Sequence, residues 1–206
     1  MASLTNFGVP VEGVGGASIM MPKLQYRFRV VLSNFGTAGA SANEITQNVI
    51  SVTRPSVTHD EVTIDAYNSR AYLAGKHTWE PITITLRDDM NNKVSALVAA
   101  QLQKQLNHGL QAAPKAGSDY KFQIRVEQLD GNDPAGVIET WTLAGCFIQN
   151  ANYNENNYAT SDVMQITLQV RYDNADIHSG SADPAADGAL SGVPLIDIAQ
   201  PGTVTG

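Results

Sequence analysis

The sequence has one cysteine, few charged residues and no long hydrophobic run. A single cysteine among 206 residues, Cys146, excludes an intramolecular disulfide and any cysteine-rich metal site, so nothing indicates an oxidising compartment. No window approaches the roughly 18 consecutive apolar residues that a membrane-spanning helix needs. The N-terminus also lacks the charged and apolar regions of a secretory signal. We therefore expect a protein that is made in a cytoplasm and is not anchored in a membrane.

Charge is scarce and unevenly distributed. Only 16% of the residues are charged, and the net charge is −7. The segment from Lys23 to Asp173 carries 13 basic and 15 acidic residues, so most of the excess negative charge falls in the two ends. Tight binding to phosphate groups needs clustered Lys and Arg. A nearly neutral central segment argues against such binding.

Apolar and polar residues alternate along the middle of the chain, which predicts antiparallel β-strands with one buried face. The alternating segments are residues 23–33, 61–67, 82–87, 120–127 and 164–172. A longer segment, Val137 to Gln149, changes its apolar parity at Ala144 and Gly145, where we expect a bulge or bend. The run from Asn150 to Asn157 should turn the chain and join this strand to the last one as a hairpin.

One amphipathic helix is predicted from Asn92 to Asn107. Its apolar face holds Val94, Leu97, Val98, Leu102 and Leu106. Asp88 and Asp89 precede it, where negative charge favours a helix N-terminus, and Gly109 follows as the expected terminating residue. We expect this helix to lie on the sheets with its Gln and Lys residues in solvent.

Together these patterns predict a mainly β protein, an antiparallel β-sandwich or barrel of six or more strands with one flanking α-helix. Both ends of the chain are rich in Gly and small residues without a clear period. We therefore divide the chain into an N-terminal arm (1–22), a β domain (23–173) and a C-terminal arm (174–206).

No group of residues predicts an active site, a cofactor site or a metal site. None of the four histidines has a metal-ligand spacing to another His or Cys, and the His59–Asp60 pair lies in a strand-rich segment that lacks further ligands. Cys146 lies in a strand pattern that suits a small buried hydrophobe. No nucleophile elbow or phosphate-binding loop is present. We expect no enzyme, no cofactor and no metal.

Uncharged polar side chains occupy the polar faces of the predicted strands. They are Gln25, Thr83, Thr85, Gln123, Gln165, Thr167 and Gln169. Such faces are either the solvated exterior of a sandwich or a surface that lines water or a neighbouring subunit. Arginines also lie on strand faces, where guanidinium groups suit interface pairing. Long strands with open edges would aggregate unless they pair in a defined assembly, so we favour an oligomer.

The segment from Val49 to His108 carries a resemblance to a known family. It runs through Val49–Pro55, a strand from Val62 to Tyr67, a loop from Asn68 to Lys76, and a strand from Trp79 to Asp89 that ends in an acidic pair and leads into the helix. This order resembles the tail tube proteins of contractile-tailed bacteriophages. The resemblance covers about residues 23 to 173, with Tyr26–Val30 and the strand to Tyr172 in the places of the first and last core strands.

The resemblance implies hexameric rings with a large inner β-barrel, stacked into a tube. One chain cannot enclose a channel by itself, because only about 16 strands or more leave an aqueous bore. The tube would conduct DNA, without specific binding, and house the tape-measure protein during ejection into the host. Further implied partners are the tail sheath, baseplate and tail terminator proteins. The implied location is the virion tail, after synthesis in the bacterial host cytoplasm.

The resemblance also implies roles for particular segments. Uncharged Gln and Thr faces suit the bore, whereas strand arginines are expected at subunit contacts. The candidate inter-subunit residues are Arg27, Arg29, Arg70, Arg125 and Arg171, and the wider set of strand arginines includes Arg87. The loops Asn34–Asn43 and Asn68–Lys76 are candidate contacts between rings. The helix is expected to face outward, and the two arms to reach neighbouring rings or the sheath.

Two alternatives remain open at this point. The first is the inner tube of a phage-derived contractile injection system, such as a type six secretion or bacteriocin-like device, which shares the fold and the stacking. The second is a carbohydrate-binding β-sandwich module, which would expose Trp or Tyr for stacking on sugars and bind as a monomer. Trp79 and Trp141 lie inside strand patterns, so we expect both to be packed.

Overall fold

The computed structural model describes residues 22–36, 43–132 and 135–180. Within these residues the chain forms nine strands, two α-helices and a short 3-10 helix. The strands are β1 (Phe28–Ser33), β2 (Val49–Val52), β3 (Val57–Ala66), β4 (Ser69–Trp79), β5 (Ile82–Arg87), β6 (Phe122–Leu129), β7 (Val137–Asn152), β8 (Gln165–Arg171) and β9 (Asn174–Ser179). The helices are α1 (Asn43–Asn48), α2 (Lys93–Gln105) and the 3-10 helix η2 (Gly117–Asp119). The predicted mainly β, antiparallel fold is therefore confirmed.

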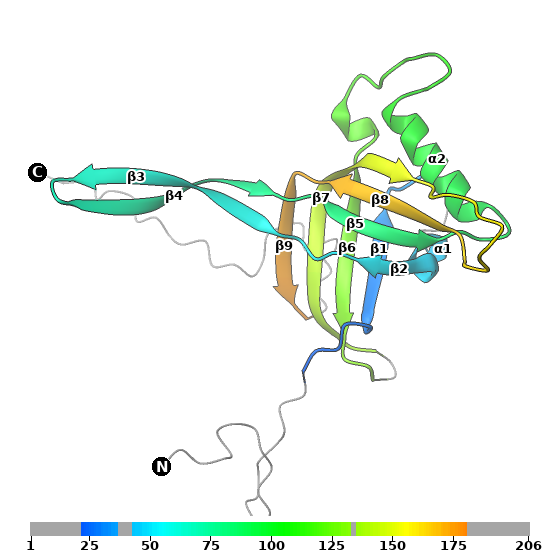
Figure 1. Ribbon diagram of the computed structural model, residues 1–206, viewed down its shortest axis with the longest axis horizontal. Coiled ribbons are helices and arrows are strands. Elements are labelled where there is room, and N and C mark those ends of the chain that lie inside the picture. Colours follow the sequence, from blue (N-terminus) through cyan, green and yellow to red (C-terminus); the bar gives the residue numbers. More distant parts are fainter. Residues whose placement is uncertain (1–21, 37–42, 133–134, 181–206) are drawn as a thin grey trace, which may run out of the picture.

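Seven strands form one sheet that folds over on itself. The strand order is β1-β6-β7-β8-β5-β2, and β9 also pairs with β7. β7 belongs to both halves because its first part pairs with β6 and β9 and its last part pairs with β8. Figure 1 shows β1, β6, β7 and β9 crossing β2, β5 and β8 at a steep angle. The two halves therefore make the two layers of a sandwich.

The bend of β7 occurs at the glycine that the sequence singled out. Gly145 has a φ of +69°, a conformation that side chains with a Cβ rarely adopt. The register confirms the bulge, since Phe122 faces Cys146 while Ile124 faces Leu143, which leaves one extra residue on β7. The same change of parity puts both Leu143 and Cys146 in the core.

The core fills the space between the layers with the alternating residues that the sequence indicated. Its central residues are nearly inaccessible to solvent, at 2% exposure or less: Val30, Leu32, Ile82, Ile84, Leu86, Ile124, Ile166, Leu168 and Val170. Helix α2 covers one end through Val94, Leu97 and Val98. Burial of this apolar surface drives the folding of the two layers onto each other.

Helix α2 is shorter than predicted at its C-terminus. Leu106, rather than Gly109, ends it with an extended backbone, and its N–H donates to the carbonyl of Leu102. At the other end, Asp89 caps the helix, because its Oδ1 accepts from the N–H of Val94 at 3.0 Å. Of the acidic pair, Asp89 thus acts at the helix start, whereas Asp88 accepts from the N–H of Asp89.

The expectation that the glutamines of α2 face solvent is wrong for two of them. Gln101 is fully buried, accepts from the N–H of Gly36 at 3.0 Å and donates to the carbonyl of Tyr120 at 2.6 Å. Gln105 pairs with both backbone groups of Ile148, at 2.8 and 2.9 Å. These amides satisfy backbone groups that the sheet leaves unpaired, so the helix docks through hydrogen bonds as well as apolar contacts.

Three predicted boundaries are also corrected. The first strand begins at Phe28 instead of Lys23, because the chain turns at Leu24 to Arg27, where the N–H of Arg27 donates to Leu24. The predicted loop from Asn68 to Lys76 is mostly strand β4, which pairs with β3 along its length. The start of the predicted C-terminal arm forms β9, which adds to the edge of β7. Residues 1–21 and 181–206 of the two arms, and residues 37–42 of the predicted loop Asn34–Asn43, lie outside the described residues.

Candidate functional site

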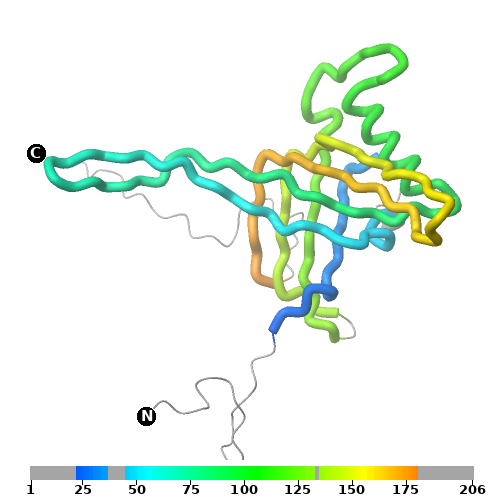
Figure 2. The backbone as a smooth tube through the Cα atoms, viewed as in Figure 1, coloured from blue at the N-terminus to red at the C-terminus, as the bar shows by residue number. Residues whose placement is uncertain are grey.

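A long hairpin projects from the sandwich. β3 and β4 form a separate two-stranded sheet that continues the line of β2 and β5 away from the body (Figures 1 and 2). Every residue of β3 is exposed, as are all residues of β4 except Gly75 and Trp79. An isolated two-stranded ribbon is at best marginally stable in water. The hairpin therefore lacks a packing partner in the described part of its own chain.

One face of the hairpin is apolar. The register places Val62 opposite Leu73 and Ile64 opposite Ala71. The exposed fractions are 48% for Val62, 47% for Ile64 and 53% for Leu73. The alternation predicted for residues 61–67 is thus present, but no layer of this chain covers it. Contiguous exposed apolar patches of this kind mark interaction surfaces.

The opposite face and the tip of the hairpin are polar or aromatic. Arg70 pairs with Asp65 across the strands at 2.8 Å, and both side chains are largely exposed. The two-residue connection Tyr67–Asn68 closes the hairpin between Ala66 and Ser69. Tyr67 has a φ of +48° and is fully exposed. For a bulky side chain this left-handed conformation costs about 1–2 kcal/mol.

Two histidines for which the sequence predicts no partner face each other near the base of the hairpin. His59 lies opposite His77, with ring centroids 6.0 Å apart. The two positions are placed nearly symmetrically about the turn, but this spacing predicts a contact only if residues 69–76 form a strand, whereas the sequence predicts a loop there. In the ranges that the structure describes, no group of three or more His, Cys, Asp or Glu is arranged to hold a metal ion.

The layer made by β2, β5, β8 and the end of β7 has an outer face of uncharged polar residues. The ladder pairs Thr85 with Thr167 and Thr83 with Gln169, and Gln165 lies in the same layer opposite Arg87. Five of the seven residues that the sequence grouped therefore share one face, whereas Gln25 and Gln123 lie elsewhere. Arg87 and Arg171 are on the same outer face, because their neighbours in sequence point into the core.

The other layer carries a charged outer face. The carboxylate of Glu127 is 6% exposed, accepts a hydrogen bond from Arg29 Nε at 2.6 Å, and forms ion pairs with Arg29 at 2.5 Å and with Arg125 at 2.9 Å. A buried carboxylate that lacked such partners would be strongly destabilising. The sequence predicts both arginines on strand faces, but it does not identify Glu127 as their common partner. Glu127 occupies a polar position in the alternation of β6, as Gln123 and Arg125 do, so the pattern does not mark it as buried.

The remaining candidate contact residues are dispersed. Arg27 donates to the carbonyl of Asp130 at 2.6 Å, and Arg171 lies in the uncharged layer, so only Arg29 and Arg125 are brought together. Asn34 follows β1 and donates to the carbonyl of Lys121 at 3.1 Å. Asn43 is the first residue of α1 and Lys76 lies within β4, which leaves Asn34 and Asn68 outside regular elements.

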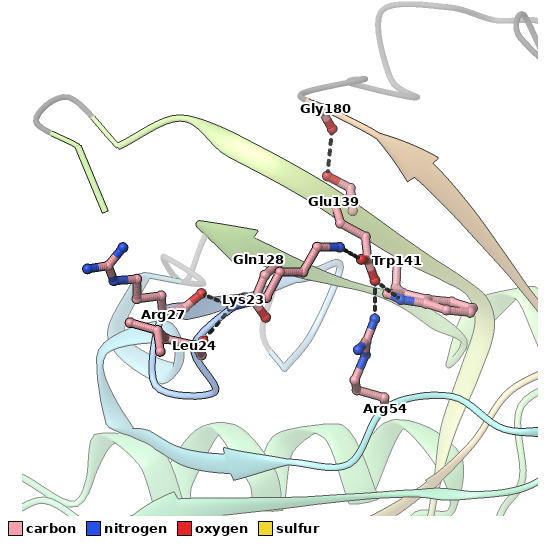
Figure 3. A network of polar contacts seen from close by, with 9 residues as sticks. Lys23, Leu24, Arg27, Arg54, Gln128, Glu139, Trp141 and Gly180 are labelled. Carbon is pink, nitrogen blue, oxygen red and sulfur yellow. Dashed lines mark hydrogen bonds and ion pairs between the residues drawn. The ribbon is translucent and has the colours of Figure 1, made fainter. Parts of the chain in front are cut away.

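The base of the hairpin is tied to the sandwich through Glu139 (Figure 3). This carboxylate is about 10% exposed, forms ion pairs with Lys23 and Arg54, and accepts from Trp141 Nε1 at 2.7 Å. Burial acts to raise the pKa of Glu139, but the bonds from Lys23 and Trp141 and the charge of Arg54 outweigh it and hold the pKa below the usual 4.5. Arg54 lies between β2 and β3, so the network fixes the point where the hairpin leaves the body.

A hollow lies at the end of the β5–β8 ladder away from the hairpin. It has a volume of about 740 Å³ and is formed by the loop between β7 and β8. Tyr158 is fully exposed there, and Val163 and Met164 are more than half exposed. Figure 1 shows this loop and the hairpin at opposite sides of the molecule.

Cys146 is buried, and burial raises the pKa of its thiol to about 12. The thiol should therefore not react with a disulfide reagent at pH 8 in the native protein, and should react fully once urea unfolds the chain. A spectrophotometric thiol assay checks this. Reaction of the native protein at the unfolded rate would contradict the packing of β7.

No protein-family model and no curated protein sequence matches this chain. Solved structures do match. A chain of the anti-feeding prophage tube-terminating cap aligns with a TM-score of 0.58 and 13% identity, covering 79% of this chain and 94% of that one. A chain of the sheath–tube complex of the PVC extracellular contractile injection system gives 0.52 and 16%, covering 87% and 99%. The SPP1 tail tube gives 0.50 and 13%, covering 90% and 95%.

These similarities establish the fold. The chain has the fold seen in tube and cap proteins of tails and contractile injection systems, which confirms at the level of fold the resemblance to tail tube proteins that the sequence showed. Within the described residues, no helix is of a length and hydropathy suited to crossing a membrane.

Proposed function

We propose that this protein is a structural tube subunit that assembles into hexameric rings, which stack into the tube of a phage tail. The observation that carries the proposal is the β3–β4 hairpin, whose apolar face is uncovered in a single chain that has a tube-protein fold. In a tube built from repeated subunits, the surface that covers this face belongs to a second copy of the chain. Assembly covers the hairpin and closes the open strand edges.

The layer made by β2, β5, β8 and the end of β7 is the best candidate for the wall of the bore. Six subunits with four such strands each would contribute roughly 24 strands, more than the about 16 at which a barrel encloses an aqueous channel. The middle of its outer face carries Thr and Gln, which hydrogen-bond water without binding phosphate tightly, while Arg87 and Arg171 lie at the two opposite ends of the β5–β8 ladder. DNA would pass through this bore without specific binding, and the tape-measure protein would occupy it before ejection.

The strand arginines keep their proposed place at subunit contacts. Arg29 and Arg125 lie on the charged layer, away from the uncharged face, as this role requires. Arg171 shares the uncharged layer, so we place it at the margin of that face, next to the adjoining subunit. The contacts between rings would include Asn34, Asn68 and the hairpin.

The proposed partners outside the tube are the sheath, baseplate and tail terminator proteins. Support comes from the assemblies that contain the similar chains, namely a sheath–tube complex, a baseplate and a tube-terminating cap. We place the protein in the virion tail after synthesis in the bacterial host cytoplasm, and we propose no catalytic role.

The inner tube of a contractile injection system is the second candidate. The anti-feeding prophage and PVC structures that share the fold favour it. A carbohydrate-binding module has less support, because Trp79 packs near Tyr172, with ring centroids 5.8 Å apart, and Trp141 donates to Glu139. Both indoles therefore make contacts within the chain, which does not fit a role in stacking on a sugar.

The assembly itself is tested by sedimentation velocity and negative-stain electron microscopy of the full chain over a series of protein and salt concentrations. The proposal predicts ring-sized species that give six-fold averages and lengthen into hollow tubes as concentration rises. A protein that stays monomeric throughout the series and binds a glycan in a screen would contradict it.

A further inference from the structure

The turn at the end of the hairpin holds an aromatic residue where the backbone disfavours one. Tyr67 has a φ of +48°, a region that suits Gly or Asn and in which bulky residues are uncommon. Its side chain is fully exposed, at 103%, so the described part of its own chain gives no packing in return. Strain that persists without local compensation is typical of functional positions.

The hollow between β7 and β8 has the chemistry to receive such a side chain. Tyr153, Tyr158 and Met164 supply aromatic and thioether surfaces, both of which pack well against an aromatic ring. Asparagine side chains in the same loop supply partners for a phenolic hydroxyl. The volume of about 740 Å³ leaves room for the ring and the adjoining turn.

We propose that Tyr67 of one copy inserts into this hollow of a second copy in the neighbouring ring. This inference rests on the proposed function, because it assigns the contact that stacks the rings. The two surfaces differ and lie at opposite ends of the β5–β8 ladder, so the contact is head-to-tail and repeats without closing. The ten residues of β3 span about 33 Å, a reach that takes the tip well beyond its own body.

Charge around the two surfaces supports the pairing. The hollow is lined by two carboxylates, Glu155 and Asp162, and by no Lys or Arg. Arg70 lies next to the turn, and its side chain is 66% exposed while paired with Asp65. A guanidinium group has five N–H donors, so Arg70 can keep Asp65 and also bind a carboxylate of the neighbouring copy.

The substitution Tyr67→Asn tests the contact between rings without destabilising the folded protomer. Asparagine tolerates the left-handed region, so the thermal unfolding temperature should stay the same or rise. The lowest concentration at which tubes form should increase about tenfold or more, while rings persist, because a buried aromatic anchor is lost. Tyr67→Phe is the matched control, and it should retain tubes close to the wild-type concentration. Negative-stain microscopy and light scattering give both readouts.

A cross-linking experiment identifies the receiving surface. Asn68→Cys, which keeps Tyr67 in the turn, and Asn156→Cys proteins, mixed and oxidised, should form a disulfide between different copies, whereas either protein alone should not. The native thiol of Cys146 is buried and does not compete.

The outcomes distinguish this inference from the proposed function. Wild-type tubes together with unimpaired Tyr67→Asn tubes, or with no cross-link in the mixture, would overturn only the inference. Loss of rings as well as tubes in Tyr67→Asn would also overturn it, since the tip would then act within a ring. A wild-type protein that forms neither rings nor tubes would overturn both.

Discussion

Replacement of Val62 with aspartate should suppress tube formation while the protomer remains folded. Val62 lies at the centre of the exposed hairpin face opposite Leu73 and contributes nothing to the sandwich core. In the assembly, a carboxylate there would have to be buried without a partner, which costs several kcal/mol. We expect the lowest concentration for tube formation to rise at least about a hundredfold, as measured by light scattering and electron microscopy.

Two control variants make the Val62 result specific. Thr63→Asp adds the same charge to the opposite face of the hairpin and should disturb assembly far less. Val62→Leu keeps the apolar surface and should assemble like the wild type. In all three variants the thermal unfolding transition should stay close to that of the wild type, because the site is exposed in the single chain. Tubes of Val62→Asp at the wild-type concentration would show that the apolar face stays in solvent.

Replacement of Glu139 with alanine should have the largest effect on the protomer itself. The change removes the anion shared by Lys23 and Arg54 and leaves Trp141 Nε1 without its acceptor. Both cations are about half exposed and regain water, so we discount the ion pairs and expect a loss of about 2–3 kcal/mol in the free energy of unfolding. Urea denaturation at pH 7 measures it. Glu61→Ala, at an exposed position in β3, is the matched control and should change this free energy by less than about 0.5 kcal/mol.

The contribution of Glu139 should depend on pH in a defined direction. Because the folded pKa lies below the usual 4.5, the carboxylate stabilises the fold fully above that value, and the stabilisation is lost as pH falls through the folded pKa. The difference in unfolding free energy between the wild type and Glu139→Gln should therefore be constant from pH 7 to about pH 5 and shrink below pH 4. A difference that is unchanged at pH 3 would contradict the ion-pair network.

The parts of the fold that were predictable from sequence are those with one buried face. β5 and β8 alternate strictly, and β6 alternates as far as Val126, because each lies against the core, and Gly145 marked the bend of β7 because few other residues accept its φ. β4 was missed because Gly75 and small residues interrupt its pattern, and the strand is held by pairing with β3 instead of by burial. β9 is short and is held to the edge of β7 by backbone pairing, which the sequence alone does not encode.

Of the candidate site, the polar face of β5 and β8 could be predicted from the sequence, but the exposed apolar face of the β3–β4 hairpin could not. The Thr and Gln residues of β5 and β8 follow the strand alternation, so their shared face could be inferred from sequence. The uncovered apolar face could not, because alternation in Val62 and Ile64 looks the same whether the covering layer belongs to the same chain or to another copy. The Glu139 network joins three segments distant in sequence and depends on tertiary packing.

The most direct test of the tube account is a cryo-EM reconstruction of the assembled full chain. The account predicts stacked six-fold rings around an open bore, with the Thr and Gln face of β5 and β8 toward the bore and the β3–β4 hairpin buried against a neighbouring copy. A reconstruction without a central channel, or one in which the hairpin remains in solvent, would contradict it.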